Sequence, residues 1–345
     1  MAGNSFNITS HISGGKVISG VVSGGQIIQG DYHNYANLSE PKTKSTEEKV
    51  DCYPLNTDPK GHMLIIANEK YQNGNHNPGA LVDRKKVETL GETLNYDVES
   101  SHKNLTSEQI RQELKNFVEK LETEPHVDSA IVFVLSHGTA DAIIGTDGVG
   151  VKRQEFFDAF KPDKCGALTG KPKLIFFDAC RGHKCDPGAA IKEKSAGQQE
   201  RAADSETDGP YTPDERAAAL AKSEIEKAVD ETATQEKVAE TKGSRPSSPA
   251  PQFSAMSDML IVDATAMDYY AYGTKSGSYF IDAVYEIFKL KYETKSIDEM
   301  LHMVHEHVLK KMHGGKMGDG TYALEGTNYS SSLRKKFMFC PPTTD

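Results

Sequence analysis

Two stretches decide the fold, Val132-Phe133-Val134-Leu135-Ser136-His137-Gly138 and Leu174-Ile175-Phe176-Phe177-Asp178-Ala179-Cys180-Arg181-Gly182. Each begins with a continuous apolar run, which is typical of a strand buried on both faces of a parallel sheet. Each run leads to a reactive side chain, His137 in the first and Cys180 in the second. Because open α/β sheets bind ligands at the carboxyl ends of their strands, we expect a site at this edge of the sheet.

Apolar runs and helical patterns alternate on both sides of these two stretches. Alternation of this kind predicts a doubly wound α/β fold. Ser107 is placed to cap the helix that begins at this residue. The expected strands cover residues 62–68, 130–135, 173–177, 259–263 and 336–339. The expected helices cover residues 82–94, 107–122, 277–291 and 297–312.

The chain has 345 residues and a net charge of −10, from 40 basic and 50 acidic side chains. This acidic balance argues against nucleic-acid binding and against a polybasic membrane anchor. No apolar run approaches the roughly 20 residues that span a bilayer, and the N-terminal residues lack the pattern of a secretory signal. Five cysteines without framework spacing suit a reducing compartment. We therefore expect a cytoplasmic protein that binds neither nucleic acid nor membranes.

Composition divides the chain into four stretches. Residues 46–188 and 252–345 have globular composition and together are long enough for one substantial α/β domain. Residues 189–251 contain a single aromatic residue, Tyr211, among many charged and small ones. Such a segment buries too little apolar surface to offset its ordering entropy, so we expect a long disordered linker. The fourth stretch, residues 1–45, is rich in Gly, Ser and Asn.

A short internal repeat occupies this N-terminal stretch. Residues 12–20 are echoed at residues 22–30, where Ser-Gly-Gly is again followed by paired β-branched residues. Val/Ile pairs with low charge and no proline are typical of strands that stack on copies from other chains. We expect residues 1–35 to drive homotypic assembly; the alternative is a disordered Gly/Ser tail.

Cys180 and His137 form a candidate catalytic pair. A cysteine becomes a useful nucleophile near neutral pH when an imidazole is close enough to take its proton. Neighbouring strand ends would bring these two side chains together. Gly138 lets backbone N–H groups approach a substrate, and a developing oxyanion needs such donors. The alternative is structural, since a buried cysteine often serves as a small hydrophobe.

Several motifs resemble the caspase family. They are Ser136-His137-Gly138, Gly145-Thr146-Asp147-Gly148, Leu168-Thr169-Gly170-Lys171-Pro172-Lys173-Leu174, Asp178-Ala179-Cys180-Arg181-Gly182, Ala264-Thr265-Ala266, Tyr269-Tyr270 and Gly277-Ser278-Tyr279-Phe280. The resemblance implies a three-layer α/β fold with a six-stranded, mostly parallel sheet. It implies a zymogen of regulated proteolysis or apoptosis, cut into large and small subunits at the linker and dimerised through the small subunit.

The same resemblance implies roles for three residues. Cys180 is expected to be the nucleophile of a cysteine endopeptidase, and His137 its general base and later its general acid. The backbone N–H groups of Gly138 and Cys180 are expected to form the oxyanion hole. Protein substrates are the expected partners.

Three positions depart from the caspase pattern. Caspases hold the Asp side chain before the cleaved bond, the P1 residue, through two Arg and one Gln. The matching positions here are Asn77, Gly273 and Asp178. Metacaspases and paracaspases are similar to this chain at Asp178 and cleave after Arg or Lys. Asp83 and Asp268 are further acidic candidates, so we expect a basic P1 preference.

Three alternatives stay open. Asp178 could cap a helix or bond its own loop. The pocket could keep Asp specificity through a rearrangement, and Ser205-Glu206-Thr207-Asp208-Gly209 resembles a caspase processing site with Asp208 at P1. The chain could also be a weakly active pseudoprotease that serves as an assembly adaptor, although such a protein has no chemical need to keep both His137 and Cys180.

Arg201 and Arg216 are cleavage candidates in the linker for an enzyme that prefers basic residues. No cofactor and no metal site are expected. No residue pattern decides whether the protein requires Ca²⁺.

Overall fold

The computed structural model describes residues 6–12, 16–23, 26–29, 51–99, 102–124, 127–186, 254–312 and 324–341. The chain divides into two compact units, residues 1–50 and 51–345. The predicted linker at residues 189–251 lies outside the described residues. Among the described helices, none is both long and apolar enough to cross a bilayer.

A small antiparallel sheet forms within the N-terminal unit. Its strands are β1 (Phe6–Ile12), β2 (Lys16–Ser23) and β3 (Gln26–Gln29). β2 pairs with both others, and its register places Ile12 opposite Lys16 and Ser23 opposite Gln26. In the sequence, residues 13–15 and 24–25 separate the strands, and each interval contains one of the repeated Gly-Gly pairs.

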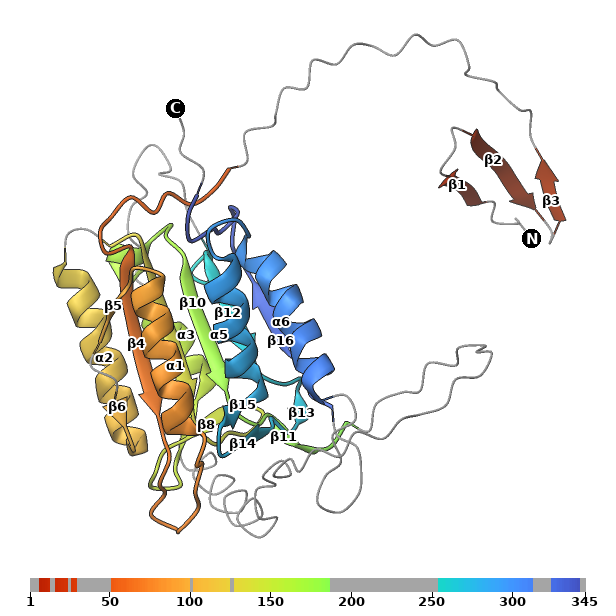
Figure 1. Cartoon of the computed structure of the whole chain (residues 1–345). Helices are drawn as coiled ribbons and strands as arrows, with labels where there is room; N and C mark the ends of the chain where they lie inside the picture. The colour runs from red at the N-terminus through yellow and green to blue at the C-terminus, as the bar shows by residue number, and fades with distance from the viewer. Residues whose placement is uncertain are drawn as a thin grey trace, which may run out of the picture. The chain divides into compact units, whose positions relative to one another are not determined.

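A mostly parallel sheet forms the centre of the second unit (Figure 1). The strands follow the order β16-β12-β10-β7-β4-β5, and a short seventh strand, β6, also pairs with β4. All neighbours are parallel except β12 and β16. The predicted α/β class with six strands along one mostly parallel sheet is confirmed. The strands are β4 (Gly61–Ala67), β5 (Asp97–Val98), β6 (His102–Lys103), β7 (Ser129–Leu135), β10 (Lys173–Asp178), β12 (Met259–Asp263) and β16 (Asn328–Ser331).

Short strand pairs gather at the carboxyl edge of this sheet (Figure 1). They shape the loops that follow the main strands, where α/β sheets carry their sites. The pairs are β8 (Ala142–Ile144) with β9 (Gly150–Lys152), β11 (Gly182–Lys184) with β13 (Asp268–Tyr269), and β14 (Gly273–Thr274) with β15 (Gly277–Ser278).

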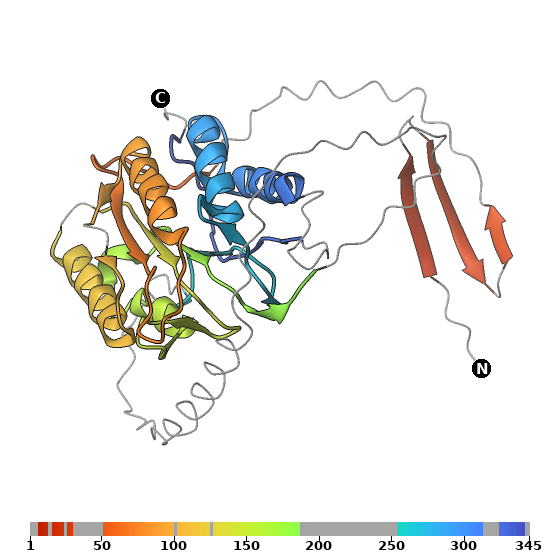
Figure 2. The same cartoon turned by 60° about the horizontal axis from the view of Figure 1, so that its bottom comes forward.

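Helices cover both faces of the sheet (Figure 2). α1, α5 and α6 pack on one face, and α2 and α3 pack on the other. The helices are α1 (Ala80–Thr93), α2 (Ser107–Thr123), α3 (Arg153–Ala159), α5 (Tyr279–Lys291) and α6 (Ile297–Met312), with a 3-10 turn at Gly166–Leu168.

Successive side chains of the central strands enter two different cores. Phe176 packs beneath α1, α5 and α6 and stacks on Phe133, with 4.4 Å between ring centroids. Phe177 points to the opposite face and meets Phe156 edge to face, with 5.4 Å between centroids. Because both faces are buried, the strands read as continuous apolar runs instead of alternating ones.

The cap of α2 differs from the predicted one. Thr106, not Ser107, is the N-cap: its side chain accepts from the Gln109 N–H, and the Gln109 side chain accepts from the Thr106 N–H. Ser107 instead donates its hydroxyl to Oδ2 of Asp147 at 2.8 Å. A polar pair at a helix start leaves two possible caps, and the reciprocal bond with Gln109 decides between them.

The predicted strand at residues 336–339 is wrong. Lys336 makes a single bridge with Cys52, while Phe337 and Phe339 are buried against each other at a centroid distance of 5.0 Å. The strand beside β12 is β16, at Asn328–Ser331, whose side chains are mostly exposed. A polar edge strand carries no apolar pattern, whereas the aromatic segment that follows it packs into the core.

Candidate active site

The two strand ends singled out by the sequence lie side by side. β7 and β10 are parallel neighbours in which Leu135 pairs with Asp178. His137 and Cys180 each follow their strand by two residues, and both line one pocket. The Ser136 N–H donates to the carbonyl oxygen of Asp178 at 3.1 Å, so the two loops continue the register of the strands.

Tyr71 fixes the orientation of His137. The two rings stack with 4.5 Å between centroids and 28° between planes. The Tyr71 hydroxyl accepts from the backbone N–H of His137 at 2.9 Å and lies 2.9 Å from Oγ of Ser136. Burial lowers the pKa of His137 to about 4. The imidazole is therefore neutral at pH 7 and able to accept a proton.

Cys180 is held as a thiol in the free protein. Burial raises the pKa of the Cys180 thiol to about 11, and the nearby Glu325 and Asp178 carboxyls act in the same direction. Its Sγ lies 3.7 Å from the carbonyl oxygen of Ala271. A protonated thiol and a neutral imidazole in one pocket are the two groups that general-base activation of a thiol requires.

Gly138 brings the two loops into close contact. A Cβ at this position would lie 2.7 Å from the carbonyl oxygen of Cys180 and 2.9 Å from Cβ of Ala179, so no larger residue fits without movement. In the described part of the chain, neither Gly138 nor Cys180 donates its N–H to another backbone carbonyl. Backbone N–H donors of this kind are what a developing oxyanion needs.

Two buried carboxyl groups line the same pocket. Asp83 comes from the first turn of α1 and Asp178 from the end of β10, and they are 1% and 8% exposed. Oδ2 of Asp83 accepts from the Ser278 N–H at 2.7 Å, and Oδ1 lies 3.5 Å from Nζ of Lys86. Burial raises the pKa of both carboxyl groups, and their mutual repulsion raises that of Asp83 further.

Two of the other three predicted substrate-binding positions also line this pocket. Asn77 lies just before α1, and Gly273 begins β14. None of the described residues that line the pocket is Lys or Arg. The pocket thus presents two acidic side chains, with Lys86 contacting one of them from the side.

Asp268 lies elsewhere. It is exposed, does not line the pocket, and forms an ion pair with Lys184 at 2.9 Å. This pairing holds the pKa of Asp268 below its usual range. The alternative role of Asp178 as a helix cap also fails, because a short strand, β11, follows the Cys180 loop. The cleavage candidates Asp208, Arg201 and Arg216 lie outside the described residues.

Sequence reasoning missed two residues that shape the pocket. The Ser278 side chain hydrogen-bonds Asp178 and also caps α5 by accepting from the Ile281 N–H at 2.9 Å. Glu325 is buried and accepts from the Tyr272 N–H at 2.5 Å. Burial holds the pKa of Glu325 well above its usual range, and Asp178 adds to this effect. A polar residue directly before a predicted helix is a recognisable N-cap, so the sequence could have indicated Ser278. The sequence around Glu325 contains no motif that indicates a place in the pocket.

A buried cluster of charged side chains contacts the loop that carries Cys180. Asp263 at the end of β12 pairs with Arg153 at 2.5 Å and with Arg181 at 3.0 Å. The Arg153 guanidinium also lies over the Phe177 ring, 4.5 Å from its centroid. Since Arg181 directly follows Cys180, this cluster fixes the loop that carries the thiol.

Comparisons with known proteins agree with this geometry. A family model of the caspase domain matches residues 60–338. The chain is 29% identical over 314 residues to Cell death protein 3 of Caenorhabditis remanei, covering 89% of this chain and 55% of that protein. It is 36% identical over 140 residues to Caspase-2 of Gallus gallus, covering 40% of this chain and 32% of that protein. The chain therefore spans about half the length of the first relative and less of the second.

A solved structure shares the fold. Caspase-1 from Spodoptera frugiperda matches with a TM-score of 0.63 and 20% sequence identity, covering 85% of this chain and 96% of that one.

Proposed function

The chain belongs to the caspase family of cysteine-type peptidases, and we propose that it is an endopeptidase of regulated proteolysis in cell death that cleaves proteins after Arg or Lys. The matched family supports the chemistry, and the relative named Cell death protein 3 supports the setting. The preference for a basic P1 residue has separate support. This preference is inferred from one observation: the buried carboxyl groups of Asp83 and Asp178 line the same pocket as His137 and Cys180.

The proposed reaction uses the pair of neutral groups described above. His137 takes the Sγ proton of Cys180 while Sγ bonds to the carbonyl carbon of the substrate. The N–H groups of Gly138 and Cys180 hydrogen-bond the resulting oxyanion. When the carbon–nitrogen bond breaks, His137 returns its proton to the leaving amine and a thioester remains. Water then attacks the thioester, His137 accepts its proton, and release of the acid regenerates the thiol.

A cationic P1 side chain suits the charge of the pocket. Two carboxylates close together in a buried site repel each other, and a guanidinium between them replaces repulsion with two charge-assisted hydrogen bonds. Arg should be preferred to Lys because its planar fork can bond both carboxylates. A P1 Asp would add a third carboxylate without a cation lining the described pocket, which is costly for a desolvated charge.

Peptides that differ only at P1 test this proposal. We expect purified full-length protein to cleave a fluorogenic peptide with P1 Arg faster than one with P1 Lys, and to cleave the P1 Asp peptide poorly. Faster cleavage after Asp would overturn the basic preference and support the rearranged, Asp-specific pocket. Absence of turnover on all three peptides, also after limited proteolysis of the linker, would support the adaptor alternative.

Processing and dimerisation complete the proposal. Maturation cuts are proposed between residues 189 and 251, with Asp208, Arg201 and Arg216 as candidates. Mass spectrometry of the mature protein should find new termini there and not inside the strands. A homodimer through residues 252–345 is supported by β16, which pairs with β12 on one side and with no described strand on the other. Light scattering on the Cys180→Ala protein tests the dimer.

Homotypic assembly through residues 1–35 is the remaining part of the proposal, together with a cytoplasmic location. The repeat and the three strands at Phe6–Ile12, Lys16–Ser23 and Gln26–Gln29 support assembly. Residues 1–40 fused to a monomeric carrier should form assemblies that seed their own growth. A fusion that stays monomeric at high concentration would contradict it.

A further inference from the structure

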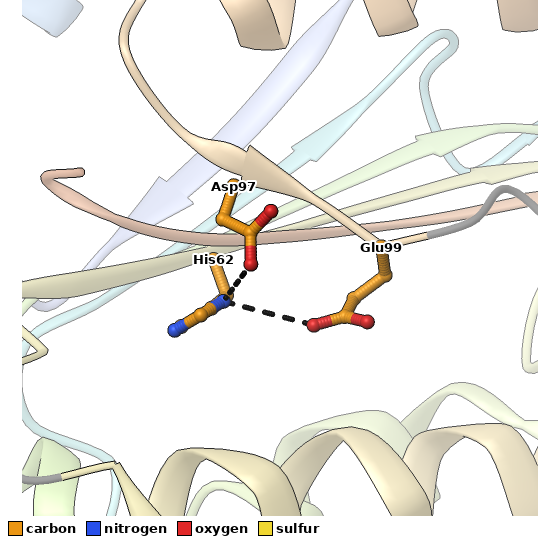
Figure 3. A group of neighbouring side chains, drawn as sticks. All are labelled: His62, Asp97 and Glu99. Carbon is orange, nitrogen blue, oxygen red and sulfur yellow. Dashed lines mark ion pairs between the residues drawn. The ribbon is translucent and has the colours of Figure 1, made fainter.

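A cluster of charged side chains lies at the amino end of β4, the end of the sheet opposite to His137 and Cys180. His62 of β4, Asp97 of β5 and Glu99 just after β5 direct their polar atoms toward one another (Figure 3). Nδ1 of His62 lies 3.2 Å from Oδ2 of Asp97 and 3.6 Å from Oε1 of Glu99. The three atoms that could serve as ligands all lie within 4.8 Å of one another.

His62 is buried and its two nitrogens have different surroundings. The residue is 3% exposed. Nε2 lies 2.5 Å from Oε2 of Glu124, a carboxylate oxygen that can only accept, so Nε2 carries a proton. Nδ1 is buried, and the polar atoms recorded beside it in the described residues are the carboxylate oxygens of Asp97 and Glu99. Nδ1 faces Oδ2 of Asp97 and Oε1 of Glu99, so a cation placed between these three atoms would contact all of them.

The charge balance of the cluster favours binding of a cation. Nζ of Lys120 lies 3.0 Å from Oδ2 of Asp97 and 2.5 Å from Oε1 of Glu99. It also lies 3.7 Å from Oε1 of Glu124. One ammonium and one imidazole therefore face three carboxylates, which leaves an excess of negative charge in the cluster. Lys120 occupies the place where a stronger cation would be held.

We propose that His62, Asp97 and Glu99 bind a divalent transition-metal ion of the zinc class. The 3.2 and 3.6 Å separations are close to the roughly 3.3–3.6 Å between ligands of a tetrahedral zinc ion with bonds of about 2.0–2.2 Å. A nitrogen donor with two carboxylates suits zinc better than magnesium or calcium, which prefer oxygen ligands alone. Water would supply the fourth ligand.

Glu124 and Lys120 have supporting and opposing roles in this site. Glu124 hydrogen-bonds the second nitrogen of His62, as carboxylates commonly do behind a metal-bound histidine. The Lys120 ammonium must move away from Asp97 and Glu99 before a metal ion can bind. Lys120 and Glu124 lie at the end of α2, so a bound ion would tie β4 and β5 to this helix. The site does not depend on the peptidase proposal.

Zinc titration of the full-length protein tests the site. Cys180→Ala serves as the background, because it removes the catalytic thiol as a competing ligand. We expect one equivalent of Zn²⁺, measured by competition with a chromophoric chelator, to be lost in His62→Gln and in Glu99→Gln. Glu124→Gln should weaken binding about 10–100-fold. Lys120→Met should strengthen binding, since the competing ammonium is gone, and His302→Gln is the matched control on an exposed helix face.

Two outcomes would overturn the proposal. One is a folded His62→Gln or Glu99→Gln variant that keeps the same number of bound zinc ions. Because Glu99 is partly exposed, Glu99→Gln should fold even if substitution of the buried His62 prevents folding, and it then tests the site by itself. The other is Co²⁺ spectra that show thiolate charge-transfer bands and are unchanged by Glu99→Gln, which would place the ion on cysteines.

Discussion

The backbone N–H of Ser278 donates a 2.7 Å hydrogen bond to Oδ2 of Asp83, 195 residues away along the chain. Asp83 lies in the first turn of α1, and Ser278 directly precedes α5. The predicted linker separates the two residues in sequence, so the bond joins the predicted large and small subunits at the pocket. This contact does not need an intact linker, and the pocket is expected to survive a cut there.

Gly277 is required for that contact. Its φ of +117° is unfavourable for other residues, and a Cβ would lie 2.1 Å from Oδ1 of Asp83. We expect Gly277→Ala to lose about 1–3 kcal/mol of stability from backbone strain alone, and to displace Asp83 as well. Thermal unfolding and kcat/KM on a P1 Arg peptide measure the two effects.

Gly148→Ala is the matched control for Gly277→Ala. Gly148 also has a positive φ, +80°, but a Cβ there would meet no atom within 4 Å. Gly148→Ala should therefore be less stable than the wild-type protein, but the folded variant should keep the wild-type kcat/KM for the P1 Arg peptide. Equal kinetic effects in the two variants would show that the clash with Asp83 is unimportant.

Removal of either member of the proposed catalytic pair should abolish turnover. Cys180→Ala and His137→Ala are each expected to lower kcat by several orders of magnitude, because members of such a unit fail together. Circular dichroism should show both variants folded. His302→Ala, on an exposed helix face, should keep full activity. Full activity in Cys180→Ala would rule out the assignment.

The reactivity of Cys180 should depend steeply on pH. Burial raises its pKa to about 11, so at pH 7 only a small fraction is thiolate, and each unit of pH increases that fraction about tenfold. Alkylation by iodoacetamide, followed on the Cys180 peptide by mass spectrometry, should rise from pH 6 to pH 9. A rate that is already constant near pH 7 would indicate a preformed thiolate–imidazolium pair instead.

The placement of His137 and Cys180 in one pocket could be predicted because its signals are local. Continuous apolar runs predicted β7 and β10, and parallel neighbours end at the same edge of a sheet. His137 and Cys180 each follow a strand by two residues, so their proximity follows from the order of the strands alone.

Other parts of the site arise from contacts that sequence patterns do not encode. Glu325 reaches Tyr272, and His62 meets carboxylates from β5 and α2. Asp268 has the same chemistry as Asp178, but an exposed position beside Lys184 gives it a different role. The residue type indicates which chemistry a side chain can perform. Burial and contacts with residues distant in the sequence determine which of several aspartates lies in the pocket.

The buried pocket acids should make the protein less stable as the pH rises. The pKa values of Asp83 and Asp178 are raised by burial, so the folded state keeps protons that the unfolded chain releases above pH 4. Stability therefore falls from about pH 4 toward neutral pH. Asp178→Asn removes one of these groups and should flatten the dependence of Tm on pH. The pKa of Asp268 is lowered, so its contribution to stability changes only below about pH 4, and Asp268→Asn should leave the dependence from pH 5 upward unchanged. An equal change in both variants above pH 5 would contradict the argument.

Substitution of Asp178 should change specificity most clearly. Asp178→Asn keeps the size of the side chain but removes one of the two charges that would face a P1 guanidinium. We expect kcat/KM for a P1 Arg peptide to fall roughly 30- to 1,000-fold, or about 2–4 kcal/mol, the range for losing one partner of a buried charge pair. A peptide with neutral P1 citrulline, of nearly the same shape, should be affected far less.

The pH dependence of Arg cleavage distinguishes loss of charge from loss of shape. Because repulsion and burial raise the pKa values of Asp83 and Asp178, the free pocket holds a proton that Arg must expel. In the wild-type protein, kcat/KM for Arg should rise with pH as the pair ionises, relative to citrulline. In Asp178→Asn, Asp83 no longer faces a second carboxylate, so its pKa falls and the rise should move to lower pH. If the Arg-to-citrulline ratio does not depend on pH in either protein, these carboxylates do not contact the P1 side chain.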